Sequence, residues 1–83
     1  MSQAAVLTGD LLLNKLSARC FPEVAHYRNI KTIDLQQLKN IDSAGLAYIA
    51  QIKSRYPDIS ITGVSDKISV LAGLYGLDFL FNA

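Results

Sequence analysis

Residues 31–56 read KTIDLQQLKNIDSAGLAYIAQIKSRY, and they contain the clearest strand and the clearest helix of the chain. Polar and apolar residues alternate over Lys31–Leu35, which predicts a strand with Ile33 and Leu35 facing inward. From Asp42 to Tyr56 the apolar residues recur at helical spacing, and Asp42 or Ser43 can supply an N-cap oxygen. Pro57 disfavours helical geometry at the residue before it, so the helix is expected to end at Tyr56.

The segments after this helix continue the alternation of strand and helix. Asp58–Thr62 alternates as a second strand, and Gly63 leads to a last helix capped by Ser65 or Asp66. We expect Gly76 to end that helix and Leu77–Phe81 to pack against the core as a strand or a helical turn. The apolar face of the last helix is expected to comprise Ile68, Leu71, Ala72 and Tyr75.

The segments before residue 31 give a less regular pattern. Two apolar runs, Ala4–Leu7 and Leu11–Leu16, are separated by Thr8-Gly9-Asp10, and this spacing predicts a β-hairpin because glycine tolerates the turn. Phe21–Asn29 is predicted to be a short helix with Pro22 at its first position. The chain is therefore expected to form a single domain over residues 1–83.

The predicted order is strand, strand, helix, strand, helix, strand, helix and a tail. Strands separated by single helices favour parallel pairing through right-handed crossovers. The sequence thus predicts an α/β fold, with a mixed, mostly parallel β-sheet, an N-terminal hairpin and helices packed on one face.

Composition excludes several classes of protein. Of 83 residues, 51% are hydrophobic and 18% are charged, which is incompatible with a disordered segment. A formal charge of +1 disfavours binding to nucleic acid. No apolar run is long enough to span a membrane, and the N-terminus lacks the basic start of a signal peptide. A single cysteine, Cys20, fits a reducing compartment, so we expect a cytoplasmic domain without a direct membrane span.

The helix over residues 42–56 has two faces of different character. Its broad apolar face is expected to pack on the sheet, and comprises Leu46, Tyr48, Ile49, Ile52 and Tyr56. The opposite face, here called the small-residue ridge, consists of Ser43, Ala47, Ala50 and Ser54. These small side chains either lie under another helix of the same domain or allow close approach by a partner protein.

Ser43 begins the ridge and admits two interpretations. A serine at a helix start usually caps the helix. The same position favours an anion, so its hydroxyl could instead be phosphorylated, and the added charge would be stabilised by the helix dipole. Gly45 has no side chain and is expected to keep the surroundings of Ser43 open.

Two motifs in this region resemble the STAS domain family. They are Ile33-Asp34-Leu35 and Ile41-Asp42-Ser43-Ala44-Gly45-Leu46, which follow the family pattern of a strand ending in Asp-Leu and a helix opening with Asp-Ser/Thr-x-Gly-Leu. Residues 61–67 and 71–77 look most like MlaB-like subunits, the small STAS subunits of Mla phospholipid ABC transporters. The resemblance covers about Leu7 to Leu80 at the level of element order.

The resemblance implies a role for each matching residue. Ser43 matches the hydroxyl that anti-sigma-factor antagonists phosphorylate, and in MlaB-like subunits this position contacts the transporter ATPase. Asp42 matches the acidic residue before it, and Gly45 and Leu46 match the start of the helix. Ala44 departs from the polar or glycine residue common in the family, which favours partner docking over phosphorylation. The expected partner-binding set is Asp42, Ser43, Ala44, Gly45, Ala47, Ala50 and Ser54, with Ser43 as the possible phosphorylation site.

The sequence offers no convergent catalytic or metal-binding set. His26 stands alone and is expected at or near the surface, Cys20 is predicted to lie in the core, and the aspartates mark turns and helix starts. Thr8-Gly9-Asp10 is not a phosphate-binding loop, because no lysine follows it. Tyr48, Tyr56 and Tyr75 are expected to face the core, and Tyr27 the solvent. We therefore predict no catalytic residue, no metal and no cofactor.

The leading hypothesis is a non-enzymatic STAS subunit that binds an MlaF-like transporter ATPase, and through it the membrane permease. Such a subunit would be cytoplasmic and peripheral to the inner membrane. The alternative is an anti-sigma-factor antagonist controlled by phosphorylation of Ser43. A third possibility, a lipid or small-anion binder, has only the apolar tail Leu77–Phe81 in its favour.

Overall fold

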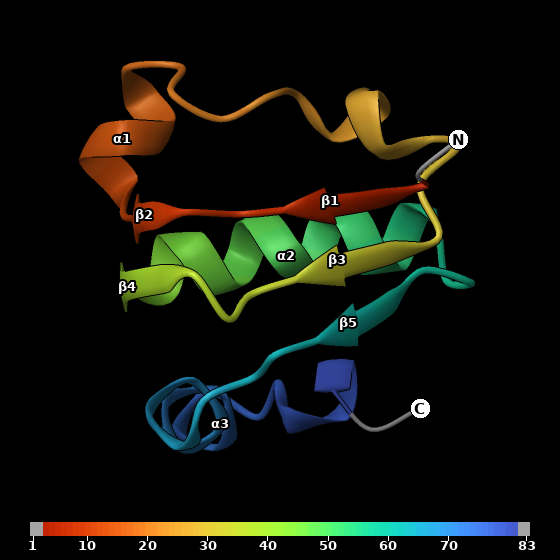
Figure 1. Ribbon diagram of the computed structural model, residues 1–83. Coiled ribbons are helices and arrows are strands. Elements are labelled where there is room, and N and C mark those ends of the chain that lie inside the picture. The colour runs from red at the N-terminus through yellow and green to blue at the C-terminus, as the bar shows by residue number, and fades with distance from the viewer. Residues whose placement is uncertain (1–2, 82–83) are drawn as a thin grey trace.

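A computed structural model describes residues 3–81 (Figure 1). The strands are β1 (Ala4–Val6), β2 (Gly9–Leu11), β3 (Thr32–Asp34), β4 (Leu38–Ile41) and β5 (Ser60–Thr62). The α-helices are α1 (Leu13–Ser17), α2 (Ser43–Arg55) and α3 (Asp66–Leu74), and two 3₁₀ turns are η1 (Val24–Tyr27) and η2 (Asp78–Phe81).

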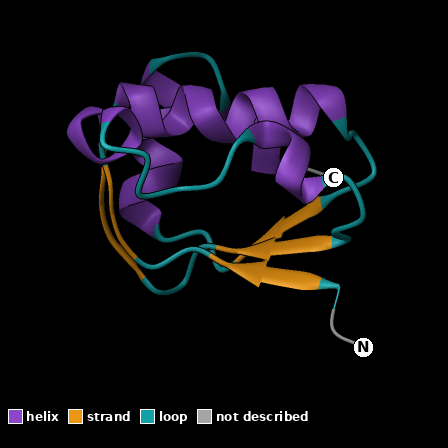
Figure 2. Ribbon diagram, turned by 90° about the horizontal axis from the view of Figure 1, so that it is seen from above, coloured by secondary structure: helices purple, strands orange, loops and turns teal. Residues whose placement is uncertain are grey.

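The strands form two parallel sheets. The first has the order β1-β3-β5, with Ala5 opposite Ile33 and Ile33 opposite Ile61. The second pairs β2 with β4. The helices lie on one side of the strands (Figure 2). The predicted α/β class, the parallel pairing and the one-sided helix layer are thus confirmed.

The predicted N-terminal hairpin is wrong. Residues 4–11 do not reverse direction: β1 pairs in parallel with β3, and β2 then pairs in parallel with β4 (Figure 1). Between them the Leu7 amide donates to the Asp34 carbonyl and the Gly9 amide donates to the Gln37 carbonyl. Gly9 has the positive φ of +78° that suggested a turn, but here it produces a bend at a register shift within a continuing chain.

Three further differences concern short elements. Residues Leu11–Leu16 were predicted as a strand, but strand β2 ends at Leu11 and helix α1 begins at Leu13. An apolar run of this length fits either a strand or a helix. The helix predicted over Phe21–Asn29 is reduced to the single turn η1. Strand β4 was not predicted, because Lys39 and Asn40 interrupt its apolar residues.

The central elements agree with their predictions. The Asp42 side chain caps α2, which ends before Pro57, and the Ser65 hydroxyl accepts a hydrogen bond from the Ile68 amide to cap α3. Helix α3 ends at Leu74, and Gly76 follows its C-cap with a φ of +69°, where the Gly76 and Leu77 amides donate to the Gly73 and Ala72 carbonyls, respectively. This pair of hydrogen bonds defines a Schellman motif, which satisfies the last carbonyls of the helix.

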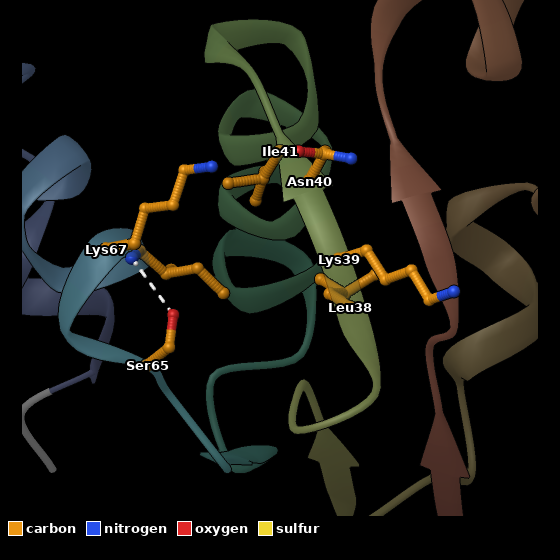
Figure 3. Close-up of a pocket in the computed structure, with 7 residues that line it drawn as sticks. Leu38, Lys39, Asn40, Ile41, Ser65 and Lys67 are labelled. Carbon is orange, nitrogen blue, oxygen red and sulfur yellow. Dashed lines mark hydrogen bonds between the residues drawn. The ribbon is translucent and has the colours of Figure 1, made fainter.

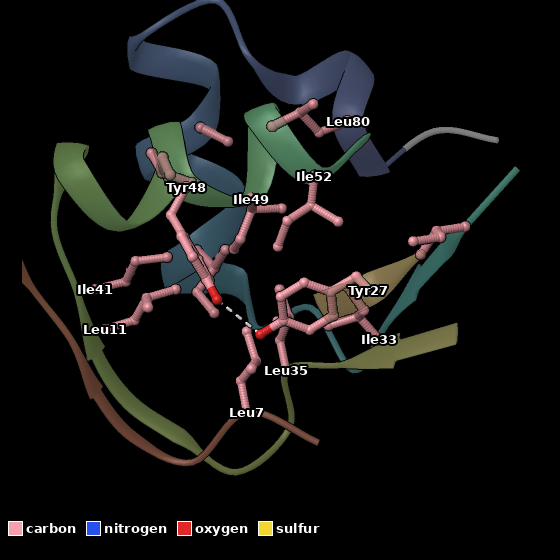
Figure 4. Packing of buried hydrophobic residues seen from close by; sticks show 14 residues of the cluster. Leu7, Leu11, Tyr27, Ile33, Leu35, Ile41, Tyr48, Ile49, Ile52 and Leu80 are labelled. Carbon is pink, nitrogen blue, oxygen red and sulfur yellow. Dashed lines mark hydrogen bonds between the residues drawn. The ribbon is translucent and has the colours of Figure 1, made fainter. Parts of the chain in front are cut away.

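One hydrophobic core lies between α2 and the strands (Figure 4). Leu46, Ile49 and Ile52 of α2 are fully buried, as their spacing predicted. They meet residues of the strand layer and of α3, and η2 closes the core with Leu80. The predicted inward residues Ile33 and Leu35 are likewise buried.

Candidate partner-docking surface

The small-residue ridge lies on the outer face of α2. Ser43, Ala47 and Ser54 are exposed, and Ala50 is half-buried. The chain's own helices therefore do not cover these three exposed residues. Of the two explanations for small side chains here, packing beneath another helix of the same domain is wrong for Ser43, Ala47 and Ser54.

An open groove of about 680 Å³ runs beside the ridge. Its floor includes Ala44, Ala47 and Tyr48 of α2, and its wall is formed by α1 and the segment from Phe21 to Val24. The remaining lining residues are Leu13, Leu16, Arg19, Pro22, Glu23 and Gln51. We call this the α1–α2 groove. Sequence reasoning missed it, because its wall depends on α1, which was predicted as a strand.

A second hollow of about 490 Å³ continues the surface toward the C-terminal end of α2. It is lined by Val24, Ala50, Gln51, Ser54 and Arg55. Val24 and Gln51 border both hollows, so the ridge residues Ala47, Ala50 and Ser54 lie along two adjoining hollows. Such a surface fits the apolar face of a helix better than it fits a small ligand.

A pair of tyrosines holds the groove wall against α2. The Tyr48 hydroxyl donates to the Pro22 carbonyl over 2.5 Å. It also lies 2.8 Å from the Tyr27 hydroxyl, which must donate to it because the Tyr48 proton is already used (Figure 4). The Phe21 ring adds a tilted contact with Tyr48, with 6.1 Å between ring centroids. Phe21, Pro22 and Tyr27 are thereby held against α2 through Tyr48.

Burial keeps both tyrosines neutral. It raises the pKa of Tyr48 far above the ordinary value for tyrosine, and the neighbouring Tyr27 raises it further. Burial also raises the pKa of Tyr27. The prediction that Tyr27 faces solvent is wrong, since it is 1% exposed, whereas Tyr75, predicted to be buried, is 56% exposed.

Asp42 joins the starts of two helices. One carboxylate oxygen accepts from the Gly45 amide at 2.9 Å, and the other accepts from the Leu13 amide at 3.0 Å, at the first residue of α1. The hydrogen bond from Leu13, followed by that from Gly45, lowers the pKa of Asp42 below its usual value. Both oxygens thus serve the protein's own backbone.

Ser43 is the first residue of α2 and does not cap it. The cap is Asp42, and the Ser43 hydroxyl makes no hydrogen bond within residues 3–81. Its side chain is exposed at the end of the ridge. The simple capping role for Ser43 is therefore wrong, and its hydroxyl is accessible.

Gly45 is a packing residue and does not open the surface around Ser43. It is buried, and a Cβ atom there would clash with the Leu11 carbonyl oxygen and lie 2.7 Å from Ile41 Cγ1. The start of α2 thus crosses β2 and β4 at a distance that only glycine permits. Of the predicted partner-binding residues, Gly45 faces inward, Asp42, Ala44 and Ala50 are half-buried, and Ser43, Ala47 and Ser54 are exposed.

Metal-ligating side chains do not gather into a cluster within residues 3–81. These residues contain no group of three or more His, Cys, Asp or Glu side chains that could hold a metal. Cys20, predicted to be buried, is exposed, and His26 is exposed as expected. A hollow between β4 and the start of α3 has a volume of only about 20 Å³ (Figure 3), which is room for about one water molecule.

Comparisons with known proteins add no assignment. Neither the models of protein families nor the curated proteins give a match to this chain. Within the described part of the chain, every helix is too short or too polar to cross a membrane. The functional interpretation therefore depends on the surface described above and on the resemblance of the motifs.

Proposed function

We propose that this protein is a non-enzymatic STAS-domain subunit that binds and supports the ATPase of an Mla-type phospholipid ABC transporter. In this role it contributes to outer-membrane lipid asymmetry. It acts in the cytoplasm and reaches the inner membrane through the ATPase, which contacts the permease. The proposal combines the STAS-like motifs at residues 33–35 and 41–46 with the small-residue ridge of α2, which begins at the exposed Ser43 of the second motif.

The observation that carries the proposal is the uncovered outer face of α2. A ridge of small residues lies open beside an apolar groove, and the groove wall is held in place by Tyr48. Small side chains lose little rotamer entropy on binding and allow a partner helix to approach closely. We expect a helix of the ATPase to lie along the ridge and to insert an apolar side chain into the α1–α2 groove.

Substitution of Ala47 tests this docking mode. Ala47 is exposed and lines the groove, so Ala47→Glu places a carboxylate where the partner's apolar side chain would enter. We expect loss of co-purification with the MlaF-like ATPase and an unchanged circular dichroism spectrum, because glutamate is a good helix former. Ser43→Glu is expected to weaken the complex without unfolding α2, since a negative charge is favourable at a helix start.

A matched control separates docking from general charge effects. Ser69→Glu adds the same charge to an exposed position of α3, outside the ridge and the groove. It is expected to leave co-purification unchanged. If the complex survives Ala47→Glu and Ser43→Glu, the ridge is not the docking surface.

An anti-sigma-factor antagonist is a second candidate function. It is favoured by the hydroxyl of Ser43, which is exposed and makes no hydrogen bond within residues 3–81. A phosphate there would lie at the start of α2 beside the Asp42 carboxylate. Incubation with an anti-sigma kinase and ATP, followed by intact mass measurement, tests this function. The absence of added phosphate on Ser43 would discard it.

A further inference from the structure

A second exposed surface lies on α3 and η2, and the proposed ATPase contact does not use it. Val70 and Leu74 are one turn apart on the outer face of α3 and are 65% and 77% exposed. Tyr75 and Phe79, 56% and 61% exposed, flank the Gly76 turn that brings η2 back beside α3. In Figure 1, α3 and η2 lie below β5, at the opposite end of the molecule from α1.

Gly73 lies on the same outer face, and nothing in residues 3–81 packs against the position that its side chain would occupy. A Cβ atom at this position would meet no other atom within 4 Å, in contrast to the buried Gly45. Glycine in a helix interior is less favourable than alanine. The face therefore combines large exposed apolar side chains with a glycine that leaves room for another backbone.

We propose that this face, formed by Val70, Gly73, Leu74 and Phe79, binds a second copy of the same chain in an antiparallel, two-fold arrangement. The charges at its two ends support this occupant. Lys67 lies in the first turn of α3, and Asp78 begins η2 beyond its last turn. Two antiparallel copies place Lys67 of each beside Asp78 of the other, and they also oppose the two helix dipoles favourably.

The exposed area is consistent with a weak dimer. Val70, Leu74 and Phe79 together expose on the order of 300 Å² of apolar surface, a size at which patches on monomers mark interaction sites. Two such faces remove about 600 Å² of apolar surface in total, and the rim around them adds to this area, so the contact falls among small, weak interfaces.

Sedimentation velocity of the purified full chain tests the proposal. Between about 1 and 300 µM we expect the mass to rise from that of one chain to that of two, as a micromolar dissociation constant requires. Leu74→Glu should weaken the dimer at least about tenfold, because it buries a carboxylate in the apolar centre. Ala47→Glu, on the ridge, serves as the matched control and should dimerise like the wild type.

Charge exchange tests the antiparallel orientation. Lys67→Asp or Asp78→Lys alone should weaken the dimer by roughly 2- to 10-fold, because each loses two exposed ion pairs. The double exchange should restore it. A monomer at 300 µM, a Leu74→Glu variant that dimerises normally, or no restoration by the double exchange would overturn the proposal.

Binding to lipid vesicles tests whether a membrane, in place of a second copy of the chain, occupies this face. Leu74-dependent co-sedimentation with vesicles of phosphatidylethanolamine and phosphatidylglycerol, by a chain that stays monomeric in solution, would assign the face to lipid and reject the dimer. None of these outcomes depends on the ATPase, so the proposed function and this inference can fail separately.

Discussion

At the scale of single residues, Asp42 determines how two helices begin. Its carboxylate accepts one hydrogen bond from α2 and one from α1, and α1 in turn forms the wall of the groove. Asp42→Ala removes both, so we expect the free energy of unfolding to fall by about 1–2 kcal/mol at pH 7, the usual cost of a lost cap. Chemical denaturation monitored by circular dichroism measures this.

The pH dependence of the stability lost in Asp42→Ala tests whether the ionised carboxylate is its cause. Because the folded-state pKa of Asp42 is lowered, its stabilisation is fully present above the unfolded value of about 3.9 and disappears as the pH falls through the folded value. The difference in the free energy of unfolding between wild type and Asp42→Ala should therefore be constant above about pH 5 and shrink below about pH 3.9. An equally large difference in the free energy of unfolding at pH 2 would contradict stabilisation by the ionised Asp42 carboxylate.

Single residues also show where sequence reasoning stops. The Asp42 and Ser65 caps were predictable, because capping depends on residues three positions apart. The burial of Tyr27 was not, since its partner Tyr48 lies 21 residues away. The second role of Asp42, toward Leu13 at a separation of 29 residues, was hidden for the same reason.

At the scale of elements, two glycines in helices have opposite consequences. Gly45→Ala drives a methyl group into the Leu11 backbone, and we expect it to destabilise the protein by about 2 kcal/mol or more, because the strand cannot move away. Gly73→Ala meets open space and should stabilise the monomer by about 0.5–1 kcal/mol. Thermal unfolding at a concentration that keeps the chain monomeric compares the two.

The pair acts as its own control, because the substitution and the type of element are the same. Equal effects of the same sign would contradict the packing assigned to Gly45. The result also bears on the STAS-like motif at residues 41–46, in which the glycine would then be required by packing of the helix on the strands.

Elements with a strong local signal were predicted correctly. β3, α2, β5 and α3 have clear periodicity with caps or prolines at their ends, and all four form. The hairpin failed because Thr8-Gly9-Asp10 specifies a bend without specifying which strand is paired, and the parallel partners β3 and β4 come much later in the chain. Short apolar runs such as Leu11–Leu16 do not distinguish strand from helix.

At the scale of the whole molecule, the docking surface combines the ridge, which the sequence predicts, with the groove, which it does not predict. The ridge follows from helical spacing within α2, and the exposure of Ser43, Ala47 and Ser54 agrees with it. The groove arises only when residues 13–24 fold back onto α2, which requires long-range contacts that leave no local pattern. The core and the surface are joined through the buried hydroxyl of Tyr48.

Tyr48→Phe tests this connection between core and surface. It leaves the Pro22 carbonyl and the Tyr27 hydroxyl without their partner, so the free energy of unfolding should fall by about 1–3 kcal/mol. Tyr27→Phe is the matched control, because it removes one hydrogen bond but keeps the contact between Tyr48 and Pro22. Under the proposed function only Tyr48→Phe should also weaken ATPase binding, measured by calorimetry, and shift the ring signals of Phe21 in NMR spectra, because the groove wall is then released. Equal loss of binding in both variants would mean that binding follows overall stability and that the wall has no separate role.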